Sequence, residues 1–254
     1  MKRTLFLFLL CCLLPLGARA EGLWLDGAHA YEGMERFFPA DRIVLTGNPL
    51  RGRFAASGDA AALKAEALAH FGLEAGKPVV LVVGGSLGTR TLNEAMKAHA
   101  DEIVREGRFQ VIWQTGKYYE REMDEFMRGR DARGIWRGAF IERMDLAYAA
   151  AVVARSGAGT VSELCLVGKA VVFVPSPNVA EDHQTKNAMA LADRGAALVV
   201  PDREAVARVF SEAGRLLADD AMRSEMEKNI RALAVADSAD RVADEILKVV
   251  KRSE

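Results

Sequence analysis

The sequence has no excess of positive charge. Its 254 residues include 34 Lys and Arg against 35 Asp and Glu, which gives a formal net charge of -1 at pH 7. Proteins that bind nucleic acid or anionic lipid through a polybasic patch need a surplus of Lys and Arg, and no such cluster occurs along this sequence. We therefore expect no nucleic-acid partner.

Cysteine is also scarce. Cys11 and Cys12 lie in an apolar run near the start, and Cys165 is the only cysteine after it. One thiol cannot form a disulfide within the chain, which favours a reducing compartment for the body of the protein. We expect neither a metal ion nor another cofactor, because no metal-ligand spacing relates Cys165 to the four histidines, His29, His70, His99 and His183.

Long hydrophobic runs are confined to the N-terminus. Lys2 and Arg3 precede an apolar run over residues 5–14, and Ala18-Arg19-Ala20 follows it. A basic start, a short apolar core and a small-x-small end are typical of a secretory signal peptide, and the run is too short to cross a bilayer as a helix. Residues 1–20 therefore predict export, in conflict with the lone thiol, unless they are a start-site artefact.

Beyond about residue 40, short apolar runs alternate with longer amphipathic stretches. This alternation predicts a Rossmann-like α/β fold, a parallel sheet covered by helices on both faces, with ligands at the carboxyl ends of the strands. Strands are expected at 43–46, 79–83, 109–114, 135–140, 152–154, 170–174 and 197–200. Helices are expected at 59–71, 89–106, 118–128, from Thr160 and from Asp182, with two or three more at the end. We expect one domain over 43–236, a remnant or linker at 21–42 and a C-terminal helix at 237–254.

The first candidate site is the turn Gly84-Gly85-Ser86-Leu87-Gly88, between an expected strand and an expected helix. Backbone N–H groups and a helix N-terminus at such a turn can bind a phosphate, and the hydroxyl of Ser86 adds a donor. The alternative is a tight turn that binds nothing, and we favour the anion site. No Gly-Lys-Ser/Thr follows, so the turn is not a Walker A loop.

The second candidate site is Ser156-Gly157-Ala158-Gly159-Thr160-Val161-Ser162-Glu163, where another strand ends and a helix begins. We expect Thr160 or Ser162 to cap this helix and Glu163 to lie in its first turn. A carboxylate there can accept hydrogen bonds from both hydroxyls of a ribose. Equally, Glu163 can serve only to complement the helix dipole.

The third candidate site is the segment from Glu181 to Asn187. Asp182 is expected at the N-cap, which places Gln184 at the start of the helix and Asn187 one turn further on. Neutral amides suit sugar hydroxyls because they both donate and accept hydrogen bonds. A solvated helix start is the alternative.

Dinucleotide binding is the natural rival for two glycine-rich turns. It requires G-x-G-x-x-G after the first strand and an acid at the end of the second. The first turn lacks that pattern, and Gln114-Thr115-Gly116 follows the second strand, so NAD is disfavoured.

Five segments in register, from about Tyr31 to the end, resemble the C-terminal half of one family. This is the undecaprenyldiphospho-muramoylpentapeptide N-acetylglucosaminyltransferase family. The segments are Thr46-Gly47-Asn48-Pro49-Leu50-Arg51, Gly84-Gly85-Ser86-Leu87-Gly88, Phe140-Ile141-Glu142-Arg143-Met144, Arg155-Ser156-Gly157-Ala158-Gly159-Thr160-Val161-Ser162-Glu163 and His183-Gln184-Thr185-Lys186-Asn187-Ala188. The resemblance implies the C-terminal, UDP-sugar-binding domain of a GT-B glycosyltransferase.

The resemblance also implies roles for the matching residues in binding UDP-GlcNAc. Arg51 and Ser86 would contact the nucleotide and its phosphates, and the backbone of Ile141, flanked by Phe140 and Met144, would hold the uracil. Gln184, with Asn187 nearby, would read the sugar hydroxyls, although this chain has His183 where relatives often carry a first glutamine. Phosphates and ribose would be enclosed by Ala158, Gly159, Thr160, Val161, Ser162 and Glu163, with Glu163 on the ribose diol.

The implied reaction is inverting transfer of N-acetylglucosamine from UDP-GlcNAc to a lipid-linked muramoyl pentapeptide, at the cytoplasmic face of the cell membrane. The family begins with another Rossmann-like domain that provides the acceptor side, the proposed base and the membrane contact, and residues 1–30 do not resemble it. We therefore expect truncation, a frame-shifted start or a separate partner chain, with truncation favoured, and we assign no catalytic residue. The alternatives are an inert UDP-sugar-binding subunit, a UDP-sugar epimerase and an exported binding protein.

Overall fold

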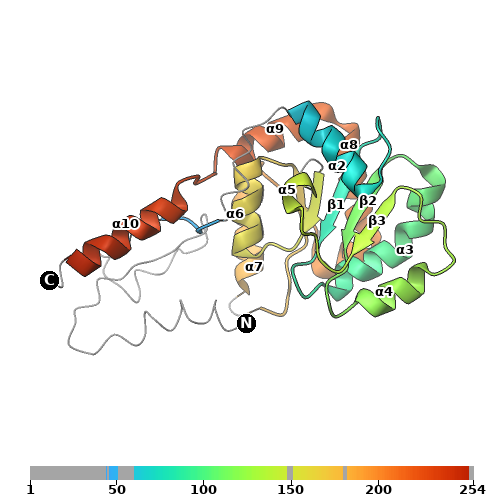
Figure 1. Ribbon diagram of the computed structural model, residues 1–254, viewed down its shortest axis with the longest axis horizontal. Helices are drawn as coiled ribbons and strands as arrows, with labels where there is room; N and C mark the ends of the chain where they lie inside the picture. The colour runs from blue at the N-terminus through green and yellow to red at the C-terminus, as the bar shows by residue number, and fades with distance from the viewer. Residues whose placement is uncertain (1–43, 45, 51–59, 148–150, 180–181, 252–254) are drawn as a thin grey trace.

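The computed structural model describes residues 44, 46–50, 60–147, 151–179 and 182–251 (Figure 1). The expected segments 1–20 and 21–42, and Arg51, lie outside the described residues. The expected division into domains therefore stays a prediction.

The described residues build a six-stranded parallel sheet with the order β3-β2-β1-β4-β5-β6. Its strands lie at six of the seven expected positions. The first has the expected bounds, the fourth begins one residue earlier than expected, and the other four are one or two residues shorter, as with Ala139 and Phe140, which have already left the sheet. The strands are β1 (Val79–Val83), β2 (Gln110–Gln114), β3 (Ile135–Gly138), β4 (Ala151–Ala154), β5 (Val171–Phe173) and β6 (Leu198–Val199).

Helices connect and cover the strands, as predicted. They are α2 (Ala60–Phe71), α3 (Arg90–Glu106), α4 (Glu120–Met127), α5 (Met144–Ala147), α6 (Ala158–Val167), α7 (His183–Ala192), the short 3-10 helix η5 (Asp202–Glu204), α8 (Ala205–Ala218), α9 (Asp220–Arg231) and α10 (Ser238–Lys251). Figure 1 shows α10 extending away from the α/β body, with the sheet enclosed between helices.

Each face of the sheet has its own hydrophobic core. Val80 and Val82 of β1 face α3, α4 and α8, whereas Leu81 and Val83 face α2, α6 and α7. Successive side chains of a strand point to opposite faces, so a strand that is covered on both sides must be apolar throughout. The uninterrupted Val79–Val83 run is explained by this double burial.

The strand expected at 43–46 is a wrong prediction for the described part of that segment. Val44 and Thr46 have no regular secondary structure, and Thr46 is fully buried. The following Asn48 donates its side-chain amide to Ser162 Oγ of α6 (3.0 Å), and its carbonyl accepts from Ser238 at the start of α10. The burial of Thr46 is as the apolar run indicates, but within the described residues neither Val44 nor Thr46 pairs with a strand.

The path of the chain creates a switch point between β1 and β4. From β1 the chain moves outward to β2 and β3, then returns to place β4 on the other side of β1. Val83 and Ala154, the last residues of these two strands, are direct partners in the sheet. The loops that follow these strands therefore start side by side and run in opposite directions. Open α/β sheets bind ligands in the crevice between two such loops.

Candidate functional site

The loop after β1 is held rigidly against the loop after β2. Gly88 has φ +82°, and a Cβ built there would lie 2.2 Å from the carbonyl oxygen of Thr115. Gly116 also has φ +82°, and its Cβ would lie 2.1 Å from Gly88 Cα. The two backbones touch only because both residues are glycines. Ser86, at the tip of the loop, is exposed.

Helix α3 begins directly after this loop. The hydroxyl of Thr89, its N-cap residue, donates to Gly84 O (2.9 Å) and, within the described residues, makes no capping bond to the helix. The first intrahelical bond is Asn93 N to Thr89 O (3.1 Å). The N–H groups of the first turn thus remain oriented along the helix axis toward the carboxyl edge of the sheet, where the helix dipole favours an anion.

Helix α6 begins earlier than the sequence predicts. Its N-cap is Gly157, so the expected capping roles of Thr160 and Ser162 are wrong. The hydroxyl of Ser162 instead donates back to Ala158 O (2.9 Å). Glu163 is the sixth helical residue and lies in the second turn, so the expected first-turn position is wrong too. Glycine is an acceptable N-cap whose lack of a side chain leaves the first N–H groups open to a ligand.

The first turn of α6 presents backbone to the solvent. Ala158 and Gly159 are exposed and Thr160 is half-buried. The side chain of Val161 is fully buried in the core, so only its backbone can meet a ligand. Glu163 is half-buried. The phosphate and ribose roles of these residues stay predictions, but the exposed helix start has the geometry they require.

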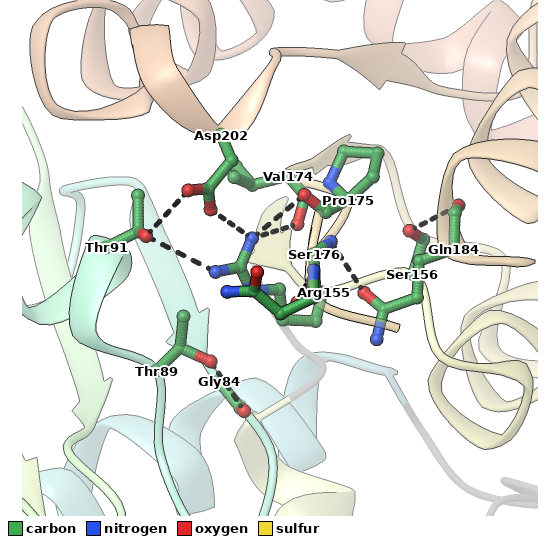
Figure 2. A network of polar contacts seen from close by, with 11 residues as sticks. Gly84, Thr89, Thr91, Arg155, Ser156, Val174, Pro175, Ser176, Gln184 and Asp202 are labelled. Carbon is green, nitrogen blue, oxygen red and sulfur yellow. Dashed lines mark hydrogen bonds and ion pairs between the residues drawn. The ribbon is translucent and has the colours of Figure 1, made fainter. Parts of the chain in front are cut away.

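Helix α7 has Asp182 at its N-cap position, as predicted, with φ +52°. Its carboxylate accepts from Thr185 Oγ1 (2.7 Å) and makes no capping bond to the helix within the described residues. Gln184 Oε1 accepts from Ser176 N (3.0 Å), and the carbonyl of Gln184 accepts from Ser156 Oγ (2.7 Å). The start of α7 is therefore joined both to the β5–α7 loop and to the loop after β4 (Figure 2).

Asn187 is less accessible than its expected role suggests. Its side chain is 2% exposed, and its amide donates to Ser156 O (2.9 Å). Its side-chain oxygen is buried and has no hydrogen-bond partner among the described residues. In this structure Asn187 fixes α7 to the loop after β4, and its sugar contact stays a prediction.

The expected uracil site follows β3. Ile141 is 2% exposed, whereas the neighbouring Phe140 is 48% exposed. The loop is fixed to the loop after β2 by bonds from Thr115 N to Gly138 O (2.9 Å) and from Gly116 N to Ala139 O (3.2 Å). The uracil contact of Ile141 stays a prediction. Because its side chain is buried, only its backbone can make that contact.

Arg155 is a residue to which the sequence analysis assigned no role. It follows the buried strand β4, and its guanidinium joins the carbonyls of Val174 and Pro175 to Thr91 and Asp202 (Figure 2). A charged side chain directly after a fully apolar strand is itself a signal, because a charge near the core needs partners. The identity of those partners was not readable from the sequence.

The described residues have no group of three or more His, Cys, Asp and Glu that could hold a metal ion. Cys165 is buried, and desolvation raises the pKa of its thiol to about 12. A neutral, inaccessible thiol is neither nucleophile nor metal ligand. None of the helices in the described ranges is long and apolar enough to span a membrane.

Comparisons with known proteins agree with this geometry. A family model described as the glycosyltransferase family 28 C-terminal domain matches residues 79–242. A relative from Parabacteroides distasonis is 48% identical over 88% of this chain and 60% of its own length. Another, from Bacteroides thetaiotaomicron, is 46% identical over 87% of this chain and 60% of its own length. Both are UDP-N-acetylglucosamine--N-acetylmuramyl-(pentapeptide) pyrophosphoryl-undecaprenol N-acetylglucosamine transferases. The chain thus spans about 60% of the length of these curated relatives.

Solved structures share the fold. MurG from Acinetobacter baumannii superposes with a TM-score of 0.64 at 25% identity, over 89% of this chain and 66% of that one. A UDP-GlcNAc 2-epimerase from Neisseria meningitidis superposes with a TM-score of 0.59 at 12% identity, over 85% of this chain and 58% of that one. The second likeness shows the fold alone. The chain belongs to the glycosyltransferase family 28 C-terminal domain family.

Proposed function

We propose that this chain binds UDP-N-acetylglucosamine at the carboxyl edge of its sheet and supplies the donor half of a transferase. The acceptor would be a lipid-linked muramoyl pentapeptide, as the names of the relatives indicate. The observation that carries the proposal is the pair of open helix N-termini, those of α3 and α6, which follow neighbouring strands at the switch point. Two such termini suit the two phosphates of a nucleotide diphosphate.

The barrier to transfer is charge separation between the anomeric carbon and the departing UDP. Backbone N–H groups at both helix starts, with the hydroxyl of Ser86, would stabilise the negative charge on the leaving group. Because the Gly88–Gly116 contact already fixes the loop before α3, the groups of that loop need little reorganisation during the reaction.

The remaining contacts follow the predicted roles. Glu163 would accept both ribose hydroxyls, and the Ile141 backbone would hold the uracil. Gln184 would contact the sugar through its amide nitrogen, since its oxygen is bonded to Ser176 N. Arg51 would contact the nucleotide from the segment that follows Leu50.

Deprotonation of the acceptor requires a base near the anomeric carbon. No described residue is assigned that role, and we infer that the base and the acceptor site belong to the part of the relatives that this chain does not span. A lipid-linked acceptor places the reaction at a membrane surface. We propose peripheral attachment at the cytoplasmic face, through that same part.

A transfer assay tests whether this chain supplies the donor site and needs a second part for the base and the acceptor site. The full chain is incubated with radiolabelled UDP-GlcNAc and a lipid-linked muramoyl pentapeptide analogue, with and without the N-terminal part of the Parabacteroides relative as a separate polypeptide. We expect no transfer by the chain alone and turnover when the second polypeptide is present. Robust transfer by the chain alone would contradict the proposal, and C2 epimerisation of UDP-GlcNAc would favour the epimerase alternative.

A further inference from the structure

The guanidinium of Arg155 connects three parts of the carboxyl edge of the sheet. Nη1 donates to the carbonyls of Val174 (2.8 Å) and Pro175 (3.0 Å), which follow β5. Nη2 donates to Thr91 Oγ1 (3.3 Å) in the first turn of α3. Asp202 of η5 lies 2.5 Å from Nη1, and its other oxygen accepts from Thr91 Oγ1 (3.1 Å). Since both N–H bonds of Nη1 point at carbonyls, we read the Asp202 contact as ionic.

This network is partly buried. The side chain of Arg155 is 13% exposed and that of Asp202 is 23% exposed. An arginine forks its N–H groups in one plane, which lets it hold two successive carbonyls and a hydroxyl at once. With these donors used inside the protein, Arg155 is placed to support the site and not to bind the ligand directly.

The network leads directly to Gln184. Arg155 donates to the carbonyl oxygen of Pro175, and the next residue in the chain is Ser176. The N–H of Ser176 donates to Gln184 Oε1 (3.0 Å). Ser156, the neighbour of Arg155 in the chain, donates its hydroxyl to the carbonyl of Gln184 (2.7 Å). Gln184 is thus held at its side chain and at its backbone by groups adjacent to Arg155 (Figure 2).

We propose that Arg155 is a positioning residue for sugar selectivity, which orients Gln184 through the β5–α7 loop. This inference rests on the proposed function, because it assumes that the sugar of a UDP-sugar meets Gln184. Loss of the hydrogen bonds of the Arg155 guanidinium should therefore lower the affinity for UDP-GlcNAc more than the affinity for UDP. The phosphates of UDP are expected at α3 and α6.

The test compares Arg155→Lys with Arg130→Lys in the full chain. Lysine keeps the charge but cannot hold two carbonyls and a hydroxyl in fixed directions. Arg130 is a matched control because it also bonds a carbonyl, Phe126 O (3.0 Å), and a carboxylate, Asp101 (2.6 Å), but after α4, away from the carboxyl ends of the strands. Calorimetry measures the affinities for UDP and for UDP-GlcNAc, and thermal unfolding measures stability.

In Arg155→Lys we expect the preference for UDP-GlcNAc over UDP to fall about tenfold, the effect of losing one or two hydrogen bonds to the sugar. UDP affinity should change little, and Arg130→Lys should leave both affinities unchanged. In a Gln184→Ala background, Arg155→Lys should have no further effect on the preference, because the arginine acts through Gln184.

Equal weakening of UDP and UDP-GlcNAc would overturn the inference, since a merely structural arginine would act on both. An unchanged preference, or full additivity with Gln184→Ala, would overturn it too. Should Arg155→Lys not fold, Asp202→Asn provides the same comparison with the arginine retained, and an unchanged preference there would be equally decisive. Failure of the unmodified chain to bind UDP would instead refute the proposed function, so the two failures are distinguishable.

Discussion

Replacing Gly88 with alanine should impair both folding and nucleotide binding, and Gly85→Ala is its matched control. Both glycines lie in the loop after β1 with almost the same dihedral, φ +82° for Gly88 and φ +84° for Gly85. They differ in their surroundings. A Cβ at Gly88 would lie 2.2 Å from Thr115 O and 2.9 Å from Gly116 Cα, whereas a Cβ at Gly85 has no neighbour within 4 Å.

The magnitude follows from this difference. Each substitution places a side chain at a positive φ, which costs about 1–3 kcal/mol. Gly88→Ala adds an overlap with backbone atoms that cannot rotate away, and forced overlap of this kind costs about 1–3 kcal/mol more. The free energy of unfolding should therefore fall by about 2–6 kcal/mol in Gly88→Ala and by about half that in Gly85→Ala.

Urea denaturation followed by circular dichroism measures the two free energies of unfolding, and calorimetry measures UDP affinity in the folded state. Any Gly88→Ala protein that folds should bind UDP more weakly than Gly85→Ala, because relief of the overlap moves the loop that carries Ser86. Equal stability and equal UDP affinity in the two variants would refute the idea that the Gly88–Gly116 contact fixes the phosphate loop.

Three further predictions concern single residues. Glu163→Ala should weaken UDP binding by about 1.5–3 kcal/mol by calorimetry, with a nearly unchanged melting temperature; unfolding with retained affinity would make Glu163 structural. With the two N-terminal cysteines replaced by serine, Cys165 should react with Ellman's reagent at pH 8 only after denaturation, because burial raises the pKa of its thiol to about 12. Since only the unfolded chain then releases that proton, stability should fall as pH rises from 9.0 toward 12, and rapid labelling of the native protein would contradict this. Asn93→Ala should lower the free energy of unfolding, measured in urea, by about 1–3 kcal/mol. The substitution removes the hydrogen-bond partner of Trp113 Nε1 (2.8 Å) and that of Thr115 O (2.9 Å). A loss below about 0.5 kcal/mol would show that water replaces both bonds.

The sheet and its helices were predictable because burial on both faces leaves an uninterrupted apolar run. Val79–Val83 is such a run, and the glycines that end it mark the position of the loop. The carboxyl ends of parallel strands share one edge, so the three candidate loops could be placed together without a structure.

Local features that depend on backbone conformation were less predictable. The start of α6 is set by the extended backbone at Gly157, and neither Thr160 nor Ser162 provides the cap although both residue types favour that position. Thr46 shows that an apolar run can indicate burial without indicating a strand.

Contacts between distant residues could not be read from the sequence at all. Arg155 meets Thr91 across 64 positions and Val174 across 19, and nothing in the local pattern names these partners. Asn187 is expected to face a sugar because its amide suits hydroxyls, and in the fold its amide nitrogen also donates to Ser156 O. Residue type indicated polar partners in both cases, and only the fold decided which.

Hydrogen exchange of the full chain with and without UDP-GlcNAc tests the central claim most directly, because it locates a bound ligand on the backbone. The account predicts slower exchange over residues 84–92 and 157–163, the loop after β1 with the start of α3 and the start of α6, and no such change with NAD. Absence of protection at both helix starts under saturating UDP-GlcNAc, or the same protection produced by NAD, would contradict a UDP-sugar site at the carboxyl edge of this sheet.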